Sequence, residues 1–253
     1  MRKTYLPCLG AALLLLAVSC KKNGDDAPAC RITSATEVTV DGPGTNFTSE
    51  LQFTYDDKKR LISAVRQVNG GTYYYASLAY SAHTIISTYS NSTGGGSVRD
   101  SVSLNDKGQI TNIRYYYGVT INDWLNTEYV YEYAGGKLLR TINSSSTPGG
   151  STVTDNVTVQ NGDITKVDDG MDPYYYEYYT DKAFRIGDPV HFDTFVTYGQ
   201  EITPNAHLAK RQMSSGDTTD YSYDIDTDNR IVKLTAVSTS AGTTTTSYKY
   251  RCD

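Results

Sequence analysis

Histidine and cysteine are scarce in this 253-residue sequence, which contains 3 His and 4 Cys. The three histidines are scattered, and the sequence has neither a His-x-x-x-His pair nor a cluster of cysteines, so it offers no recognisable ligand set for a transition metal. A Gly-x-Ser-x-Gly nucleophile turn and a phosphate-binding loop are missing as well. We therefore expect no metal and no cofactor, and we assign no catalytic residue.

Positive charge is also in short supply. The 23 Lys and Arg are outnumbered by 28 Asp and Glu, which gives a formal net charge of -5. This balance provides no electrostatic case for binding nucleic acid or an anionic lipid surface. Methionine is rare as well, with 3 residues, which argues against a helical bundle. An apolar content of 38% and an aromatic content of 11% nevertheless exclude simple disorder.

Tyrosine dominates the aromatic residues, with 23 Tyr against 5 Phe and 1 Trp. Tyrosine suits pleated, half-exposed surfaces. Leu51, Phe53 and Tyr55 alternate with the polar residues Gln52 and Thr54, and similar alternation recurs along the chain. A two-residue period is typical of strands that are buried on one face. The sequence therefore predicts an all-β protein.

The N-terminus predicts a lipoprotein signal peptide over residues 1–19. A basic start, Met1–Lys3, precedes an apolar run from Leu6 to Val18, which is too short to span a bilayer comfortably. Ala17-Val18-Ser19-Cys20 resembles a bacterial lipobox, in which the cysteine is acylated and becomes the first mature residue. We predict lipidation of Cys20 and a lipidated tether over residues 20–29, and the alternative is an ordinary signal peptide with an incidental cysteine.

The remaining cysteines predict a disulfide. Cys8 is removed with the signal peptide and Cys20 is acylated, which leaves Cys30 and Cys252 in an oxidising compartment. A bridge between them would close a loop of roughly 200 residues and contribute about 4–5 kcal/mol in the chain-entropy model. Two unpaired thiols are the alternative.

Three segments repeat the same hairpin signal of strand, polar turn and strand. They run from Phe53 to Leu61, from Val102 to Ile110 and from Tyr223 to Ile231. Asp, Asn and Gly in the turns tolerate the left-handed backbone that tight hairpins need. Together with shorter relatives, these units predict an antiparallel meander of about 15–17 strands.

The two end cysteines favour a closed sheet. In a closed antiparallel meander the start of the first strand lies beside the end of the last, where a disulfide can form, whereas an open sheet holds them apart. We therefore predict that residues 30–253 form one domain, a meander closed or nearly closed into a flattened barrel. Residues 187–206 alternate poorly, and Phe192, Phe195 and Val196 have helix-like spacing, so we expect a short irregular or helical insert that covers the interior.

A lipid-spanning porin does not fit this pattern. Lipid-facing strands need an apolar outer band flanked by aromatic girdles. Here one strand face carries polar residues such as Glu132, Ser222 and Lys249, and the other is apolar and aromatic. We expect the polar face to lie outside in water and the tyrosine face to line the interior.

The hairpin unit Phe53-Thr54-Tyr55-Asp56-Asp57-Lys58-Lys59-Arg60-Leu61 resembles the YD-type repeats of large bacterial surface shells. The mature chain resembles a family of Bacteroidetes lipoproteins of unknown function whose domain has a porin-like β fold. Residues 161–164, 199–205 and 221–250 also carry this resemblance. The charged run Lys21–Asp26 resembles the surface-export signal of such lipoproteins, and a simple solvated tether is the alternative. The resemblance implies a location on the outer membrane, with the cell surface as the exposed side and the periplasmic side as the alternative, and it brings no known catalytic residue.

Two local groups of polar residues have alternative interpretations. His191 with Asp193 is the constellation closest to acid–base chemistry, although a loop histidine with an ordinary hydrogen bond explains it as well. Asp224, Asp226 and Asp228 alternate like the start of a calcium loop, but the glycine and the terminal glutamate of that loop are missing. We interpret these aspartates as a hairpin turn.

Three tyrosine triplets, Tyr73–Tyr75, Tyr115–Tyr117 and Tyr174–Tyr176, place tyrosine on both faces of a strand. The outward members are either cross-strand packing or a contact surface for a glycan or a protein. We expect a non-enzymatic outer-membrane lipoprotein that acts as a binding or structural module, with a glycan, a peptide or an envelope protein as partner. The alternative is a carrier or chaperone for an apolar ligand in a tyrosine-lined interior, and a hydrolase is a distant third.

Overall fold

The computed structural model of the chain describes residues 30–41, 45–69, 71–91, 98–117, 124–145, 152–199, 202 and 205–252. The predicted signal peptide, residues 1–19, and the predicted tether, residues 20–29 with Cys20, lie outside the described residues.

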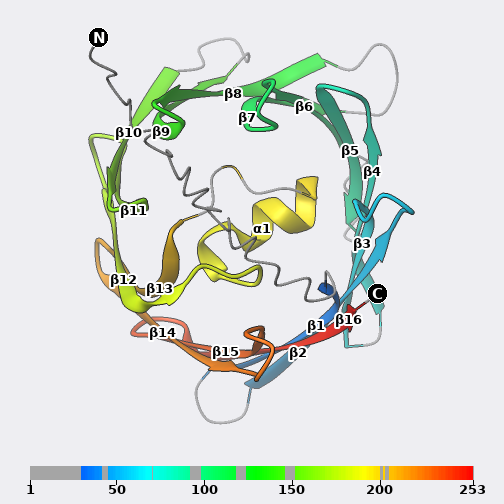
Figure 1. Ribbon diagram of the computed structural model, residues 1–253, viewed down its shortest axis with the longest axis vertical. Coiled ribbons are helices and arrows are strands. Elements are labelled where there is room, and N and C mark those ends of the chain that lie inside the picture. Colours follow the sequence, from blue (N-terminus) through cyan, green and yellow to red (C-terminus); the bar gives the residue numbers. More distant parts are fainter. Residues whose placement is uncertain are drawn as a thin grey trace, which may run out of the picture.

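The strands form one antiparallel meander that closes on itself (Figure 1). Each strand pairs with the next along the chain, and the last pairs with the first, which confirms the predicted all-β barrel. One helix lies between β12 and β13, within the predicted insert. The elements are β1 (Cys30–Asp41), β2 (Thr45–Tyr55), β3 (Leu61–Val68), β4 (Gly71–Tyr80), β5 (Thr84–Asn91), β6 (Val98–Leu104), β7 (Ile110–Tyr117), β8 (Trp124–Ala134), β9 (Lys137–Ser145), β10 (Thr152–Gln160), β11 (Asp163–Asp168), β12 (Tyr174–Ala183), α1 (Pro189–Tyr198), β13 (His207–Ser214), β14 (Asp217–Ile225), β15 (Ile231–Ser238) and β16 (Gly242–Cys252).

The barrel has two different ends because every pairing is antiparallel. All odd-numbered strands begin at one end, where the even-numbered strands finish, and we call this the turn end. The three predicted hairpin turns and the segment with α1 connect strands there. The opposite end is called the loop end.

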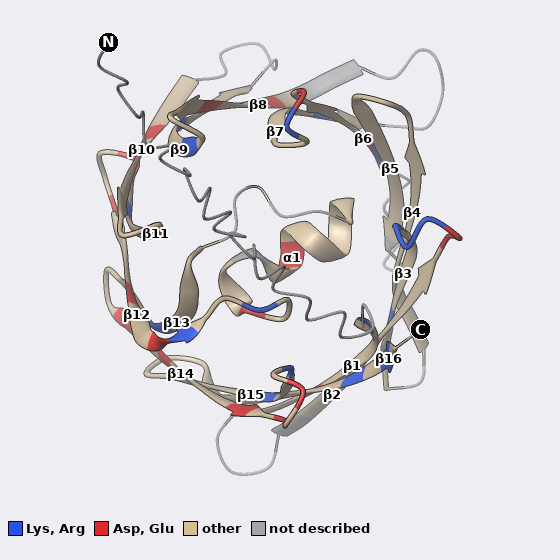
Figure 2. Cartoon of the chain, in the orientation of Figure 1, with Lys and Arg blue, Asp and Glu red and all other residues tan. Residues whose placement is uncertain are grey.

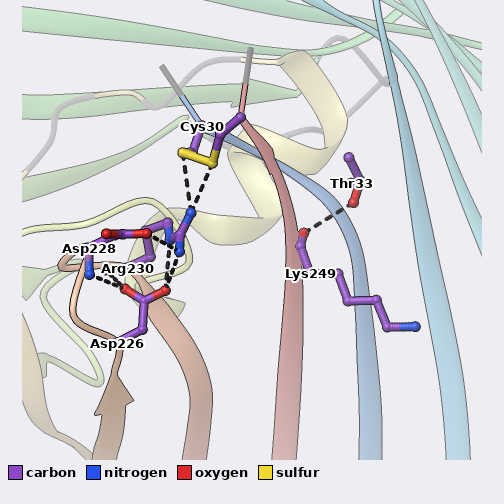
Figure 3. Close-up of a disulfide and its surroundings, with 7 residues drawn as sticks. Cys30, Thr33, Asp226, Asp228, Arg230 and Lys249 are labelled. Carbon is purple, nitrogen blue, oxygen red and sulfur yellow. Dashed lines mark hydrogen bonds and ion pairs between the residues drawn. A yellow bond between two sulfur atoms is a disulfide. The ribbon is translucent and has the colours of Figure 1, made fainter. Parts of the chain in front are cut away.

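A disulfide between Cys30 and Cys252 joins β1 to β16 at the turn end. The two residues lie directly opposite each other in the pairing, which continues to Val40 opposite Thr243. The Nη1 group of Arg230 donates to the sulfur of Cys252 at 2.9 Å and to that of Cys30 at 3.3 Å (Figure 3). The turn between β14 and β15 therefore contacts the seam between the first and last strands.

The repeated hairpin units share one turn geometry. In the first, the Asp56 carboxylate accepts a hydrogen bond from the Arg60 backbone N–H at 2.9 Å, and the Asp56 N–H donates to the Arg60 carbonyl at 3.0 Å. Asp226 and Arg230 repeat both bonds with the same distances. Asp and Asn commonly organise turns in this way by bonding backbone N–H groups. One residue in each turn has a positive φ, namely Lys59, Gly108 or Asn229.

An aliphatic ring lines the barrel at the turn end. One buried aliphatic residue near the start of each odd-numbered strand contributes to it, and none exposes more than 6% of its surface. Burying a side chain of this size stabilises a fold by about 1.5–3 kcal/mol. The ring consists of Ile32, Leu61, Ile85, Ile110, Leu138, Ile164, Leu208 and Ile231.

Tyrosine hydroxyls of even-numbered strands bind backbone carbonyls at the starts of the preceding odd-numbered strands. The Tyr80 hydroxyl donates to the Leu61 carbonyl at 2.7 Å, and burial raises the pKa of Tyr80 to about 12, so this donor stays protonated at neutral pH. Each such bond adds a side-chain hydrogen bond to the backbone hydrogen bonds that pair the two strands. The same bond joins Tyr55 to Ile32, Tyr133 to Ile110, Tyr178 to Ile164, Tyr223 to Ala209 and Tyr250 to Ile231.

The aromatic face of the sheet lies inside the barrel, and the polar face lies outside. Tyr221 and Tyr223 expose 8% and 9% of their surface, whereas Ser222 and Asp224 are exposed. Charged residues occur on many strands around the wall (Figure 2). Charges on a lipid-facing strand are destabilising, so this outer wall suits water. Outward ion pairs join neighbouring strands between Arg114 and Glu128, Arg140 and Glu132, and Arg211 and Asp220.

No helix in the described part of the chain combines the length and the apolar character that a membrane crossing requires.

Replacing both seam cysteines, with Cys30→Ser and Cys252→Ser, should lower the free energy of unfolding by about 5 kcal/mol. The disulfide connects residues separated by 222 positions, so its loss frees a very long loop in the unfolded chain. Urea unfolding monitored by circular dichroism measures the change. Reductant should produce the same loss in the wild type and leave the double variant unchanged; equal unfolding midpoints without reductant would contradict this prediction.

Candidate functional site inside the barrel

Helix α1 lies inside the barrel and is surrounded by the strands (Figure 1). Asp188 caps its start, because the carboxylate accepts a hydrogen bond from the Val190 N–H at 3.1 Å, and Pro189 occupies the first turn. Gly199 ends the helix with a left-handed φ of 67°, and its N–H donates to the Phe195 carbonyl at 2.7 Å. An aspartate followed by proline at the start and a glycine at the end are typical helix boundaries.

The helix packs against the barrel wall through aromatic residues. The ring of Phe192 lies edge-on to Tyr248, with centroids 5.6 Å apart, and also contacts Phe53. Phe195 contacts Phe53 at 6.1 Å, and Phe195 and Val196 expose 9% and 5% of their surface. Aromatic pairs of this geometry contribute about 0.5–1.5 kcal/mol each beyond the area they bury. We refer to residues 184–199 together with Ile202, Asn205 and Ala206 as the plug.

Hydrogen bonds fasten the plug to strands spaced around the barrel. In some of these bonds the donor belongs to the wall, and in others it belongs to the plug. These bonds pair polar groups of the plug with the wall, so the plug forms part of the core at the turn end. The bonds join Tyr248 to the Gly187 carbonyl, Ser87 to the Thr197 carbonyl, Tyr198 to Asp100, Tyr133 to the Ile202 carbonyl, and the Ile164 N–H to Asn205.

Asp188 is a buried carboxylate that does more than cap α1. Its Oδ2 atom accepts hydrogen bonds from the Ala209 N–H at 2.8 Å and from the Tyr223 hydroxyl at 3.1 Å, in addition to the cap on Val190. Its surface is only 1% exposed. Burial raises the pKa of Asp188 to about 6, against the opposing effect of its donors. The carboxylate therefore connects the helix start to β13 and β14.

Asp100 holds the other end of the helix and is fully buried. Its Oδ2 atom accepts a hydrogen bond from the Tyr198 hydroxyl at 3.0 Å, and the Tyr198 and Tyr115 hydroxyls lie 3.0 Å apart. Within the described part of the chain, Oδ1 of Asp100 is buried without a hydrogen-bond partner. Burial raises the pKa of Asp100 to about 7. A substantial fraction of this carboxyl is therefore neutral at neutral pH.

A cavity of about 140 Å³ lies between α1 and the wall formed by β1, β2, β3, β15 and β16. We call it the lumen cavity. Glu37 and Arg66 at this cavity expose 31% and 29% of their side chains, so solvent reaches them. The volume is close to that of an engineered protein cavity that accepts benzene. The lining combines the apolar residues Ala35, Leu51, Pro189, Phe192, Leu234 and Tyr248 with the polar residues Glu37, Arg66, Asp193 and Thr246.

The aspartates that resemble a calcium loop form a hairpin turn. The Arg230 guanidinium lies 2.6 Å from both Asp226 and Asp228, so it supplies the positive charge at this turn (Figure 3). Asp224 points toward Lys233 at 3.9 Å. In the described ranges, no group of three or more His, Cys, Asp or Glu is arranged to hold a metal ion.

Among the histidine side chains that the structure describes, His207 contacts a carboxylate. The ring atom Nδ1 of His207 lies 2.7 Å from Oδ2 of Asp163, and the backbone N–H of His207 donates to Oδ1 of Asp163 at 2.9 Å. The side chain of His191, in α1, lies outside the described residues, and His83 is exposed. The sequence gives no local signal for the His207 contact, because its two members are 44 positions apart.

The exposed tyrosines of the triplets do not form one patch on the described strands. Tyr73 and Tyr75 expose 44% each on β4, and Tyr175 exposes 43% on β12. These two strands are far apart in the order of the barrel. Tyr74 and Tyr176 face inward and pack against the core. The surface tyrosines therefore give little support to a contact surface on the outer wall.

Two crystal structures of porin-like proteins are similar to this chain. The protein from Bacteroides uniformis ATCC 8492 has a TM-score of 0.61 and 14% sequence identity, and the match covers 87% of this chain and 98% of that one. The protein from Bacteroides vulgatus ATCC 8482 has a TM-score of 0.55 and 12% identity, with the same coverage of both chains. The fold is porin-like. No protein-family model and no curated protein matches the sequence.

The variant Asp100→Asn should be more stable than the wild type at pH 8, by on the order of 2 kcal/mol. The pKa of the folded carboxyl is raised, so the wild type is most stable when this group is protonated and loses stability as the pH rises from about 4 through 7. Asparagine retains an acceptor for Tyr198 without a charge. Urea unfolding at pH 5 and pH 8 tests this, and the advantage of the variant should shrink at pH 5.

Asp188→Asn is the matched control, because this carboxylate has donors on both oxygens. An amide nitrogen cannot accept from the N–H of Val190 or Ala209, so the lost hydrogen bond, at about 1–3 kcal/mol, offsets the gain from removing the charge, and the control should be less stable at pH 8 than Asp100→Asn. Equal responses of the two variants, or a destabilised Asp100→Asn protein at pH 8, would contradict the difference between the two acids.

Gly199→Ala should destabilise the protein by about 3 kcal/mol, from the left-handed backbone and from overpacking. A Cβ atom at this position would collide with the Tyr80 hydroxyl and lie 3.2 Å from Cβ of Leu61. Gly216→Ala is the matched control, because Gly216 also has a positive φ but has open space around it, so only about 1 kcal/mol should be lost. Thermal or urea unfolding gives both values, and similar losses would argue against close packing of the plug.

Proposed function

We propose that this protein is a lipid-anchored, non-enzymatic binding module of the bacterial outer membrane. The observation that carries the proposal is the position of the plug. The same end of the barrel contains the start of β1, which follows the predicted tether, and the plug, which packs against the core there. A module built in this way is closed toward its anchor and presents its loop end to partners.

The anchor is the acylated Cys20. Two or more acyl chains hold a protein stably on a membrane, whereas a single chain binds only marginally. A tether over residues 20–29 spans at most about 35 Å when it is fully extended. The turn end therefore stays within about one domain diameter of the bilayer, and the polar outer wall remains in water.

The outer wall and the fold support a role in the envelope. Ion pairs such as Arg114 with Glu128 on the outer wall do not suit a lipid surface. The similar crystal structures are of porin-like proteins from Bacteroides, which fits an envelope location for this chain too. The charged run Lys21–Asp26, which resembles an export signal, supports exposure on the cell surface.

The partner is a glycan, a peptide or another envelope protein that approaches the loop end. Tyrosines that face inward supply amphipathic contact area, as in the pair Tyr74 and Tyr89 and the pair Tyr115 and Tyr129. The lumen cavity of about 140 Å³ does not itself suit a carrier of bulky apolar molecules, because pockets for drug-sized ligands typically measure ~300–1,000 Å³. Glycan and peptide arrays probed with the mature protein in detergent test the partner class.

Cys20→Ser should move the protein from the membrane fraction to the soluble fraction, because the acyl chains can no longer be attached. Cys8→Ser is the matched control: it lies within the predicted signal peptide and should leave the distribution unchanged. Fractionation with immunoblotting and the intact mass of the mature protein measure both variants. Retention of the Cys20→Ser protein in the membrane fraction would overturn the anchor.

A further inference from the structure

We infer that the lumen cavity binds a free α-amino acid with an apolar side chain. The inference rests on the binding role proposed above and names a small ligand for it. Two parts of the cavity carry the argument: an apolar wall that encloses a side chain, and a charged rim that recognises an ammonium and a carboxylate group at the same time.

The apolar wall matches a side chain of leucine or phenylalanine size. Leu51 and Leu234 approach from the barrel, and Phe192 approaches from α1. Phe192 is fixed edge-on against Tyr248, whose hydroxyl is held by the Gly187 carbonyl at 2.9 Å. A volume of about 140 Å³ with such walls is comparable to an apolar protein cavity that binds benzene. The wall is therefore largely preformed, which favours binding of a small apolar group.

The rim places opposite charges side by side without joining them by a hydrogen bond. Nη2 of Arg66 and Oε2 of Glu37 form an ion pair at 3.7 Å, a distance that is longer than a hydrogen bond. Ser49 donates to the same Glu37 oxygen at 2.9 Å and fixes the carboxylate. Both charged groups thus have bonding capacity for a ligand. The ammonium and carboxylate groups of an α-amino acid are separated by one carbon, so they can meet Glu37 and Arg66 together.

The balance of charge at the rim selects for a zwitterion. Arg66 offers a planar fork of donors that suits a carboxylate. Glu37 and Asp193 are two acceptors for an ammonium group, and Asp193 projects from the exposed side of α1. With two carboxylates and one guanidinium, the rim disfavours an acidic amino acid, which would add a second negative charge. The predicted ligand class is therefore leucine-like or phenylalanine-like.

Isothermal titration calorimetry of the mature protein in detergent tests this inference. L-leucine and L-phenylalanine should bind saturably with one site per chain. N-acetyl-leucine, which lacks the ammonium group, and leucinamide, which lacks the carboxylate, should each bind at least tenfold more weakly. L-glutamate should bind at least tenfold more weakly than leucine as well.

Variants test which rim residue contacts the carboxylate of the ligand and which contact its ammonium group. Arg66→Gln should weaken leucine binding at least tenfold and leave the weak binding of leucinamide unchanged. Glu37→Gln and Asp193→Asn should weaken leucine binding but leave N-acetyl-leucine unaffected. Arg140→Gln on the outer wall is the matched control and should not alter affinity. Asp193 is exposed, so its variant should fold normally. It therefore still tests the inference if a change at Arg66 or Glu37 impairs folding.

Two outcomes would overturn the inference. One is the lack of saturable binding of both apolar amino acids at about 10 mM, well above the range of weak specific binding. The other is binding that is indifferent to blocking the ammonium and carboxylate groups. A hit on the glycan or peptide array together with either outcome would overturn the amino acid site alone and leave the proposed binding module standing.

Discussion

The space inside a sixteen-strand barrel is the constraint on which the rest of this structure depends. A wall with this many strands encloses more volume than its own side chains can fill, and an apolar lining cannot remain in contact with water without cost. At the turn end the plug excludes water from the apolar lining, because Phe195 and Val196 pack in one buried cluster with the aliphatic ring. Bringing a helix into the interior creates a second demand, because its ends carry unpaired backbone groups. Asp188 meets that demand at one end and Gly199 at the other.

The repeated hairpin motif is a device that links each unit to its neighbour. Asp56 shapes the turn through the Arg60 backbone, and the Arg60 guanidinium lies 4.5 Å from the centre of the Tyr80 ring in the following hairpin. The hydroxyl of Tyr80 then returns to the carbonyl of Leu61, the residue after Arg60. The last hairpin repeats the arrangement with Arg230, Tyr250 and Ile231. One short motif therefore specifies the turn, the stacking of a cation on an aromatic ring and the tie between strands.

Alternation and the end cysteines were sufficient to predict the strands, the closure of the sheet, the inward face and the position of the insert. The boundaries of α1 were also within reach, because Asp188-Pro189 and Gly199 are ordinary helix signals. The buried acids were not predictable: Asp100 looks like any polar residue in a strand, and its partner Tyr198 is 98 positions away. The lumen cavity depends on contacts between α1 and strands from both ends of the chain, and no local pattern reports such contacts.

The disulfide at the seam shows how little the barrel depends on where its polypeptide starts. Cys30 and Cys252 lie opposite each other in an antiparallel strand pairing of the same kind as the other fifteen strand pairings of the barrel. The seam therefore differs from the other pairings only by its disulfide. A peptide linker across it, with a cut at the Gly135-Gly136 turn, would yield a circular permutant with the same neighbours for every strand. Its contact map would be preserved while the order of synthesis changed. Each strand of the closed barrel has two paired neighbours, whichever strand comes first in the chain.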